Sequence, residues 1–488
     1  MERVVVIGAG ISGLSAAHRL TEIAPALEVT VLEATDRAGG LCRSERHGAL
    51  LVEGGPDSIL TDKPWALELA RRIGLEREII STRNDNRGSY VVCRGRLERV
   101  PEGFTLLAPV RVMPFLTTRT LSLRGKARAA LEIALPRGAR GDDESLASFV
   151  RRRFGHEVLE RLAQPLVSGI YGADPEELSL RATMPRFLDL ERDVRSVTLG
   201  LMRASRRKAA GPATGARYAM FISFREGIET LPKALASRLG TRIRYGAEVR
   251  ALERRVPAVA ASARQWSVVL ESGERVDADA VIVAIHAHAA ARLVAPLEPD
   301  LSRALAGLSY GSTASVTLAL DRSDVPHPLD AFGFVVPSIE RRPILACTWS
   351  SVKYEGRAPA GTALLRVFFG GPSAAAMLAG ATDVELEALA RSELEALLGI
   401  AKTAPAQLVR VHRHLSAMPQ YRVGHADRVA EIEERVQRLG GGRFALAGNA
   451  YRGVGPPDSV RSGEAAASAV AQAGLGAGRD VVDRADPR

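Results

Sequence analysis

The chain has 488 residues, of which 46% are hydrophobic and 25% are charged, and its formal net charge is +10. This composition is typical of a soluble globular protein, and the length predicts about three domains. Its three cysteines, Cys42, Cys93 and Cys347, are odd in number and widely spaced, so neither a disulfide framework nor a cysteine metal site is predicted. No apolar run reaches the roughly eighteen residues of a membrane-spanning helix.

The positive charge is concentrated in two clusters, at 151–153 and 206–208. Such clusters attract nucleic acid, acidic lipid or an anionic substrate, but for each cluster alone a solvated helix face or loop is the commoner explanation. Because no nucleic-acid-binding motif accompanies them, we predict no nucleic-acid partner. The chain begins almost directly in a strand, without a cationic and then apolar leader, so we expect a cytoplasmic protein.

The first elements in the chain form a βαβ unit. A short β-branched run, "RVVVIG", predicts a buried strand, a helix follows from about Ile11 to Ala24, and "LEVTVLEA" predicts the next strand. The turn fits G-x-G-x-x-G, in which the glycines permit a tight turn, the approach of a pyrophosphate and close packing of the helix on the sheet. Glu33 follows at the place where an acid holds ribose hydroxyls and repels the 2′-phosphate of NADP. The predicted contacts of this unit are Gly8, Gly10, Ile11, Ser12, Gly13 and Glu33.

Two glycine-containing loops follow, "ATDRAGG" and "VEGGPDS". They place a cation and glycine backbone just beyond the ribose site, which a NAD dehydrogenase does not need. The first loop resembles the signature of the flavin amine-oxidase superfamily, where it runs along the pyrophosphate and ribityl chain. For the second loop an ordinary surface turn is an equal alternative. The cofactor contacts predicted here are Arg37, Gly39, Gly40, Gly54, Gly55, Pro56 and Asp57.

The middle of the chain changes from helical to mixed patterns. A helical stretch is predicted from about Leu123 to Arg206, and its clearest helix has Asp143 as N-cap and Gly155 as its end. We interpret 206–217, rich in glycine, alanine and proline, as a mobile loop. Strands and helices alternate over 218–290, strands with one long helix occupy 305–415, and 476–488 is predicted to be a disordered tail.

A second glycine turn lies near the end of the sequence, in "FALAGNAYRGVGPPDSVRSGEAAASAV". The pattern predicts a strand at 443–447, a glycine turn and a helix from about Ser459. A helix N-terminus at this place suits the electron-rich edge of a reduced flavin. This layout resembles the C-terminal strand–turn–helix that closes the flavin half of FAD in the flavin amine-oxidase superfamily. The resemblance implies that the two ends of the chain hold the two ends of one long cofactor. The contacts predicted here are Gly448, Asn449, Gly453, Val454, Gly455, Ser459 and Val460.

Motifs along nearly the whole chain resemble, in order, the oxygen-dependent protoporphyrinogen/coproporphyrinogen oxidase family of the flavin amine-oxidase superfamily. They are "GDDESLASFVRRRFG", "PLVSGIYGADPEELSL", "FREGIETLPKALASRL", "FGFVVP", "MPQYRVGH" and "GNAYRGVGPPDS". The chain departs from the family at 206–217, in the tail, and in "PPDSV", where many members have a cysteine after the aspartate. That cysteine is not needed for flavin chemistry.

The resemblance implies an α/β (α+β multidomain) fold. A discontinuous Rossmann-like FAD-binding domain would comprise 1–90, 218–300 and 425–475. A mixed-sheet substrate domain would comprise 91–122 and 301–424, and a membrane-facing helical domain 123–205. The family pattern also places Val249 at the adenine and Ala284 in the next flavin-contacting strand. We predict that FAD is bound non-covalently, because the closing "GNAYRGVG" turn has no cysteine or histidine.

The resemblance further implies three rounds of porphyrinogen oxidation by FAD, with O2 as acceptor, H2O2 as by-product and the porphyrin as product for haem synthesis. The chemistry belongs largely to the flavin, and we assign no general acid or base. The family pattern indicates five substrate contacts, and each has a structural alternative as a helix end, core packing or a surface cation: Arg87, Gly169, Phe332, Val335 and Tyr354. Two His-x-His pairs, 286/288 and 412/414, have no neighbouring carboxylate or cysteine, so we predict no metal.

The sequence leaves the substrate open. "SLRGKARAA", "ACTWSSVKY" and "GPDS" resemble the branch that uses coproporphyrinogen III, whereas Arg87 resembles the branch that uses protoporphyrinogen IX. The balance falls slightly toward protoporphyrinogen IX. More distant alternatives are an amine or carotenoid oxidase and a non-catalytic flavin-binding protein. Peripheral membrane contact through 123–206 and contact with another haem-pathway enzyme are further expectations, and the oligomeric state is not predicted.

Overall fold

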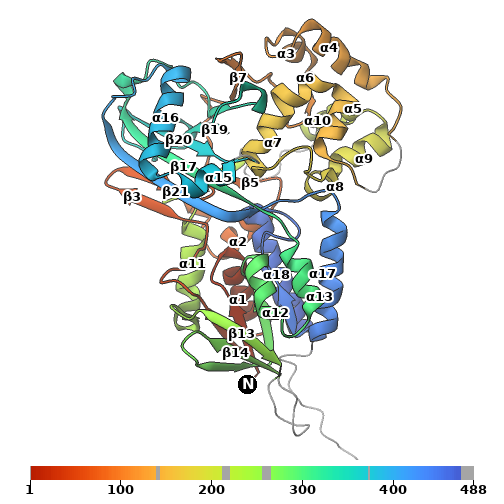
Figure 1. Ribbon diagram of the computed structural model, residues 1–488, viewed down its shortest axis with the longest axis vertical. Helices are drawn as coiled ribbons and strands as arrows, with labels where there is room; N and C mark the ends of the chain where they lie inside the picture. Colours follow the sequence, from red (N-terminus) through yellow and green to blue (C-terminus); the bar gives the residue numbers. More distant parts are fainter. Residues whose placement is uncertain (1, 139–142, 211–219, 255–264, 372–373, 474–488) are drawn as a thin grey trace, which may run out of the picture.

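The computed structural model describes residues 2–138, 143–210, 220–254, 265–371 and 374–473. Figure 1 shows three regions: a nucleotide-binding region around α1 and α18, a large sheet carrying α15 and α16, and a group of helices from α3 to α10 beside that sheet. The tail at 476–488 and residues 211–217 of the expected mobile loop lie outside the described residues.

A five-stranded parallel sheet forms the centre of the nucleotide-binding region. Its order is β12-β2-β1-β16-β22, the doubly wound order 3-2-1-4-5 when its strands are counted along the chain. All of Val4–Ile7 is buried, with alternate residues packing on opposite faces, as a two-sided parallel sheet requires. The strands are β1 (Arg3–Ile7), β2 (Glu28–Leu32), β12 (Ile243–Arg244), β16 (Ala280–Val283) and β22 (Phe444–Leu446).

The first and last helices of the fold pack together on this sheet. These are α1 (Ile11–Ile23) and α18 (Pro456–Gln472), and a Cβ added to Gly463 would lie 2.1 Å from the Ser12 carbonyl oxygen. Only a glycine permits this approach, which brings the two predicted glycine turns to one edge of the sheet. The surrounding helices are α2 (Trp65–Arg72), α11 (Thr230–Leu239), α12 (Ala287–Val294), α13 (Pro299–Ala306) and α17 (His425–Gly440).

Small antiparallel sheets complete this region. A meander follows the order β13-β14-β15, β11 lies between β5 and β6, and β3 pairs with β4. Their bounds are β3 (Ser44–His47), β4 (Leu50–Glu53), β5 (Ile59–Leu60), β6 (Ile79–Ser81), β11 (Phe221–Phe224), β13 (Val249–Arg254), β14 (Trp266–Leu270) and β15 (Arg275–Ala278).

A seven-stranded sheet in the order β21-β17-β20-β19-β18-β7-β8 forms the second region. Only β18 and β7 pair in parallel, so the sheet is mixed, as expected. The long helix expected here is α16, which starts with a Thr382–Glu385 capping box and ends at Gly399. The elements are β7 (Tyr90–Cys93), β8 (Arg96–Arg99), β17 (Tyr310–Asp321), β18 (Gly333–Val335), β19 (Ala346–Trp349), α14 (Ser350–Lys353), β20 (Thr362–Phe369), α15 (Ala374–Gly380), α16 (Asp383–Leu398) and β21 (Ala406–Pro419).

The helical region begins before the expected boundary, after a short hairpin of β9 (Phe104–Thr105) and β10 (Ala108–Pro109). No helix among the described residues is long and apolar enough to cross a bilayer. The elements are α3 (Val112–Thr117), α4 (Leu123–Ala130), a 3-10 turn at Leu131–Ile133, α5 (Leu146–Phe154), α6 (His156–Val158), a π-helical turn at Leu159–Ala163, α7 (Gln164–Tyr171), α8 (Leu180–Thr183), α9 (Pro185–Val194) and α10 (Val197–Ala210).

Two local expectations in this region are wrong. Ser145, not Asp143, caps α5, because its hydroxyl accepts from the Ser148 N–H at 3.1 Å. Asp143 instead accepts from the Ser179 hydroxyl at 2.7 Å and from the Gly424 N–H at 2.9 Å, which links distant segments. The helix ends at Gly155 as expected, with φ +95°. Residues 206–210, expected in a loop, are the end of α10.

Candidate functional site

A continuous cavity of about 3080 Å³ extends from the nucleotide-binding sheet to the helical region. Ordinary ligand pockets hold about 300–1,000 Å³, so this cavity has room for a dinucleotide and a second large molecule. Its floor includes the first turn of α1 and the Asp57 loop, and its far walls come from α7, α9 and the sheet strands β18 and β19.

Most of the predicted cofactor residues line this one cavity. The residues at its surface are Gly8, Gly10, Ile11, Ser12, Glu33, Gly39, Gly40, Gly55, Pro56, Asp57, Val249, Ala284, Gly448, Asn449, Val454, Gly455 and Ser459. Segments that are hundreds of residues apart in the sequence therefore meet around one space.

The other predicted cofactor residues support that surface from behind. A Cβ on Gly13 would lie 1.9 Å from the Gly8 carbonyl oxygen, so Gly13 permits the packing of α1. Arg37 donates to the Gly40 carbonyl at 2.9 Å. The Gly54 carbonyl accepts from His414 Nε2 at 2.7 Å. The two remaining predicted cofactor residues are Gly453, whose φ is +130°, and Val460, whose side chain is fully buried.

The turn before α1 fits the phosphates of a dinucleotide. A Cβ added to Gly10 would meet no atom within 4 Å, and no side chain caps the helix. The first-turn N–H groups therefore face open space, where an anion binds favourably. Glu33 is fixed beside this turn, because its carboxylate accepts from the Ala9 N–H at 2.7 Å and from the Thr35 hydroxyl at 2.8 Å.

Four of the five predicted substrate residues line the same cavity: Arg87, Gly169, Phe332 and Val335. The Phe332 N–H donates to the Gly88 carbonyl at 3.0 Å, which places Phe332 next to the loop of Arg87. Gly169 lies inside α7 rather than at its end, where Gly172 has φ +57°. A Cβ there would make an ordinary 3.7 Å contact with Val335, so the backbone at Gly169 is not strained.

Tyr354 lies beneath the floor of the large cavity rather than at its surface. It is 2% exposed, and its hydroxyl donates to the Ser58 hydroxyl at 2.8 Å. The Arg357 guanidinium lies 5.3 Å from the centre of its ring. In this structure Tyr354 therefore supports the Asp57–Ser58 turn, and the sequence signal did not distinguish that position from the cavity wall.

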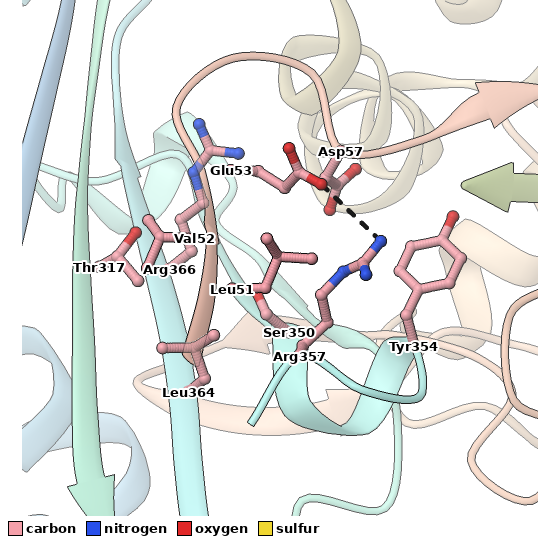
Figure 2. A pocket seen from close by; sticks show the side chains of 10 residues that line it. All are labelled: Leu51, Val52, Glu53, Asp57, Thr317, Ser350, Tyr354, Arg357, Leu364 and Arg366. Carbon is pink, nitrogen blue, oxygen red and sulfur yellow. Dashed lines mark ion pairs between the residues drawn. The ribbon is translucent and has the colours of Figure 1, made fainter. Parts of the chain in front are cut away.

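Sequence reasoning missed a buried ionic cluster around this turn (Figure 2). Lys353 Nζ lies 2.9 and 3.0 Å from the Asp57 carboxylate oxygens. Burial alone raises the pKa of Asp57, but the Lys353 ammonium, the Ser58 hydroxyl and the Arg366 guanidinium together outweigh burial and lower that pKa to about 2. Arg366 donates to the Gly55 carbonyl at 2.8 Å and to the Gly54 carbonyl at 3.2 Å, so it holds the loop from the side of the large sheet.

Besides Arg366, five arginines on the cavity wall have no carboxylate partner among the described residues. Arg250 and Arg292 lie on β13 and α12 of the nucleotide-binding region, whereas Arg87 precedes β7, Arg119 follows α3 and Arg186 lies in α9. Two other arginines on this wall are paired, Arg99 with Asp330 and Arg111 with Glu102. A guanidinium left free beside a cavity is suited to two parallel hydrogen bonds with a ligand carboxylate. No single sequence motif marks these positions, because they come from separate elements.

The histidines of both His-x-His pairs contact other protein groups. His412 Nε2 lies 3.1 Å from Glu45 and His414 binds the Gly54 carbonyl, whereas His286 and His288 contact the Tyr310 ring. Within the described part of the chain, no group of three or more histidine, cysteine, aspartate or glutamate side chains is arranged to hold a metal ion.

Known proteins resemble this chain over almost its full length. Residues 11–471 match the family described as flavin containing amine oxidoreductase. The chain is 33% identical to coproporphyrinogen III oxidase of Bacillus subtilis, with 96% of this chain and 97% of the relative covered. It is 34% identical to the enzyme of the same name from Propionibacterium freudenreichii, covering 97% and 92%. Identity to Bos taurus protoporphyrinogen oxidase is 31%, covering 96% and 98%.

A solved structure shares the fold. A protein of Exiguobacterium sp. 255-15, described as a protoporphyrinogen oxidase, superimposes with a TM-score of 0.82 at 28% identity, covering 96% of this chain and 98% of that one. The chain thus belongs to the flavin-containing amine oxidoreductase family and, within it, to the group of coproporphyrinogen III and protoporphyrinogen oxidases.

Proposed function

We propose that this protein oxidises coproporphyrinogen III to coproporphyrin III for haem synthesis, with non-covalently bound FAD and with O2 as the final acceptor. The observation that carries the proposal is the single cavity that joins a dinucleotide-binding turn to a wall with unpaired arginines. Bound FAD supplies the two-electron oxidation, which is the cofactor's own chemistry. The protein binds and orients both molecules.

The residues around the cavity divide this work. Glu33 and the open turn at Gly10 suit the ribose and the pyrophosphate. Arg366 and His414 fix the Gly54–Gly55 backbone beside the predicted flavin ring position. Phe332, Val335 and the small Gly169 offer an apolar wall to a flat macrocycle.

The substrate preference differs from the one that the sequence suggested. From the sequence, Arg87 alone was expected to bind one of the two propionates of protoporphyrinogen IX. The cavity wall has Arg119 and Arg186 as well, neither with an acidic partner among the described residues, and coproporphyrinogen III has four propionates. The similarity to coproporphyrinogen III oxidases supports the same choice. We therefore prefer coproporphyrinogen III and retain protoporphyrinogen IX as the second candidate.

The proposal is tested on the purified protein. Flavin released by denaturation is identified by chromatography against FAD and FMN. The protein is then incubated with each porphyrinogen and, separately, with a set of primary amines, while porphyrin fluorescence and H2O2 are recorded. We expect FAD in the supernatant and porphyrin formation with H2O2. Oxidation of an amine without oxidation of either porphyrinogen would identify an amine oxidase instead.

We also propose that an apolar surface of the helical region contacts an anionic bilayer peripherally. Its exposed residues are Val112, Met113, Leu116, Leu123, Leu131 and Ile133. The cations Arg111, Arg124 and Lys126 lie on the same short helices or beside them, a combination that suits an acidic lipid surface. This surface starts before the expected 123–206.

Flotation with anionic vesicles at low and high salt tests this contact. We expect the protein to float at low salt, with partial release at high salt, because salt screens surface charge. Met113→Glu should reduce flotation, and Val384→Glu, at an exposed apolar position on α16, should not. Absence of flotation at low salt would exclude this membrane contact.

A further inference from the structure

A second, much smaller cavity, whose lining residues are drawn in Figure 2, adjoins the large one. Its volume is about 10 Å³, about that of a single water site. Asp57 and Arg366 line both cavities, so these two side chains form the partition between them. The small cavity is also lined by Glu53, Thr317 and Arg357.

The polar groups around the small cavity are suited to one water molecule. The Thr317 hydroxyl is buried and has no hydrogen-bond partner among the described residues, which is costly for a buried polar atom. Carboxylates of Glu53 and Asp57 and the Arg366 guanidinium line the same space. A buried water needs two to four such partners.

The inference rests on the proposed function. We propose that Glu53, reached from the large cavity through Asp57 and one water molecule in the small cavity, stores the proton that the substrate releases in each round of oxidation. The stored proton then returns to the large cavity when O2 is reduced.

The atoms and electrons balance over one round. In each round the porphyrinogen loses two hydrogen atoms, that is two electrons and two protons, and the three rounds together break four C–H and two N–H bonds. Two electrons and one proton go to the flavin, and the second proton goes to the Glu53 carboxylate. Reduction of O2 to H2O2 consumes the two electrons and both protons, which leaves Glu53 ionised for the next round.

The pKa values of Glu53 and Asp57 indicate different roles for these two acids. Burial raises the pKa of Glu53 to about 7, against the opposing effects of Ser44, Arg357 and the Ile228 N–H. An acid with a pKa near the working pH can take up and release a proton readily. Asp57, paired with Lys353, stays ionised and attracts the proton without keeping it.

The groups that face Glu53 are few. Arg357 lies 3.7 Å away, and the Ser44 hydroxyl donates to Glu53 at 2.6 Å. Behind Ser44, Glu229 accepts from the Ser44 N–H at 3.0 Å and also binds Lys233. The buried Cys42 thiol has a pKa raised to about 12 by burial, so it remains neutral. Across the small cavity lie Asp57 and Arg366.

The first test does not depend on any substrate. Infrared difference spectra of the flavin-loaded protein are recorded across pH 5–9 for wild type, Glu53→Gln and Glu229→Gln. We expect a buried carboxylic-acid band that titrates with a midpoint near pH 7 in wild type and Glu229→Gln, and that is absent in Glu53→Gln. A wild-type protein without this band, or a band that persists in Glu53→Gln, overturns the inference.

The second test counts protons during anaerobic reduction by coproporphyrinogen III in weak buffer near pH 7 with an indicator dye. Wild type should release well under one proton per flavin reduced, and Glu53→Gln should release one. Thr317→Val, which removes a partner of the water, should move release toward the Glu53→Gln value. Equal release by all three proteins contradicts a proton store. Failure of any porphyrinogen to reduce the flavin refutes instead the proposed function on which the store depends.

Discussion

Two buried ionic clusters among the described residues, one in the helical region and one beneath the large cavity, differ in how closely their charges are paired. In the helical region, Arg153 and Glu132 are both fully buried, with 2.5 Å between Arg153 Nη2 and Glu132 Oε1. Beneath the cavity, Glu53 lies 3.7 Å from Arg357 and borders a space that fits one water.

The partners of the two acids show what each cluster does. Glu132 also accepts from the Ser196 hydroxyl at 2.7 Å and from the Val197 N–H at 2.8 Å, so both of its oxygens are used and the start of α10 is fixed. Glu53 also accepts at both oxygens, from the Ser44 hydroxyl at 2.6 Å and from the Ile228 N–H at 3.0 Å. Burial nevertheless raises its pKa to about 7, and the small cavity that it lines contains the unpartnered Thr317 hydroxyl. The first cluster thus joins helices, and the second retains the freedom to change its charge.

Removing the charge at Arg153 should have the largest effect on stability. Arg153→Met leaves the Glu132 carboxylate buried without its cation, so the free energy of unfolding should fall by about 3–5 kcal/mol. Urea unfolding followed by circular dichroism measures the change. Arg124→Ala, at an exposed position on α4, is the control and should change stability by less than about 0.5 kcal/mol. A loss below about 1 kcal/mol for Arg153→Met would contradict a structural role for this cluster.

The pH dependence of stability should have opposite signs in the two clusters. The folded pKa of Glu53, about 7, lies above its ordinary value of 4.5. Its contribution to stability is therefore fully present below pH 4.5 and is lost as pH rises through 7. Relative to Glu53→Gln, wild type should lose roughly 3 kcal/mol over that interval.

Glu191, whose carboxylate lies 3.3 Å from Arg153 Nη1 in the helical cluster, should behave in the opposite way. Burial alone raises its pKa, but Arg152, the Gly138 N–H and Arg153 outweigh burial and lower it. Its contribution is present above pH 4.5 and is lost as pH falls through the lowered value. Urea titrations of wild type, Glu53→Gln and Glu191→Gln at several pH values measure both trends. Parallel trends in the two variants would remove the distinction between the clusters.

The comparison also includes the arginines of the cavity wall that have no acidic partner, because we expect their charges to bind a ligand. If Arg119 and Arg186 bind propionates, Arg119→Ala and Arg186→Ala should each lose about 1.5–3 kcal/mol of substrate binding. This loss appears as a KM for coproporphyrinogen III raised about tenfold or more, with kcat and flavin content nearly unchanged. Arg124→Ala, outside the cavity wall, is again the control. Equal losses on protoporphyrinogen IX would mean that the arginines do not select the substrate.

The nucleotide-binding elements could be predicted from the sequence because their constraints are local. Gly8, Gly10 and Gly13 meet at one turn, and the structure shows the open space at Gly10 and the close contact at Gly13 that their pattern predicts. The C-terminal helix was also expected, although it begins at Pro456 rather than near Ser459.

Features that depend on distant contacts could not be predicted in this way. Asp143 resembles an N-cap, but its partners lie 36 and 281 residues away in the chain. Tyr354 and Glu53 lie beneath the cavity because β20 and the β3–β4 hairpin pack around them, and no local pattern encodes that packing. The Asp57–Lys353 pair spans 296 residues for the same reason.

The central claim is tested most directly by kcat/KM of the wild-type flavoprotein on coproporphyrinogen III and protoporphyrinogen IX under identical conditions. Two further carboxylates bound by arginines predict a preference for coproporphyrinogen III of about tenfold or more. A preference for protoporphyrinogen IX would contradict the role given to Arg119 and Arg186. Oxidation of neither porphyrinogen by the flavin-loaded protein would contradict the account as a whole.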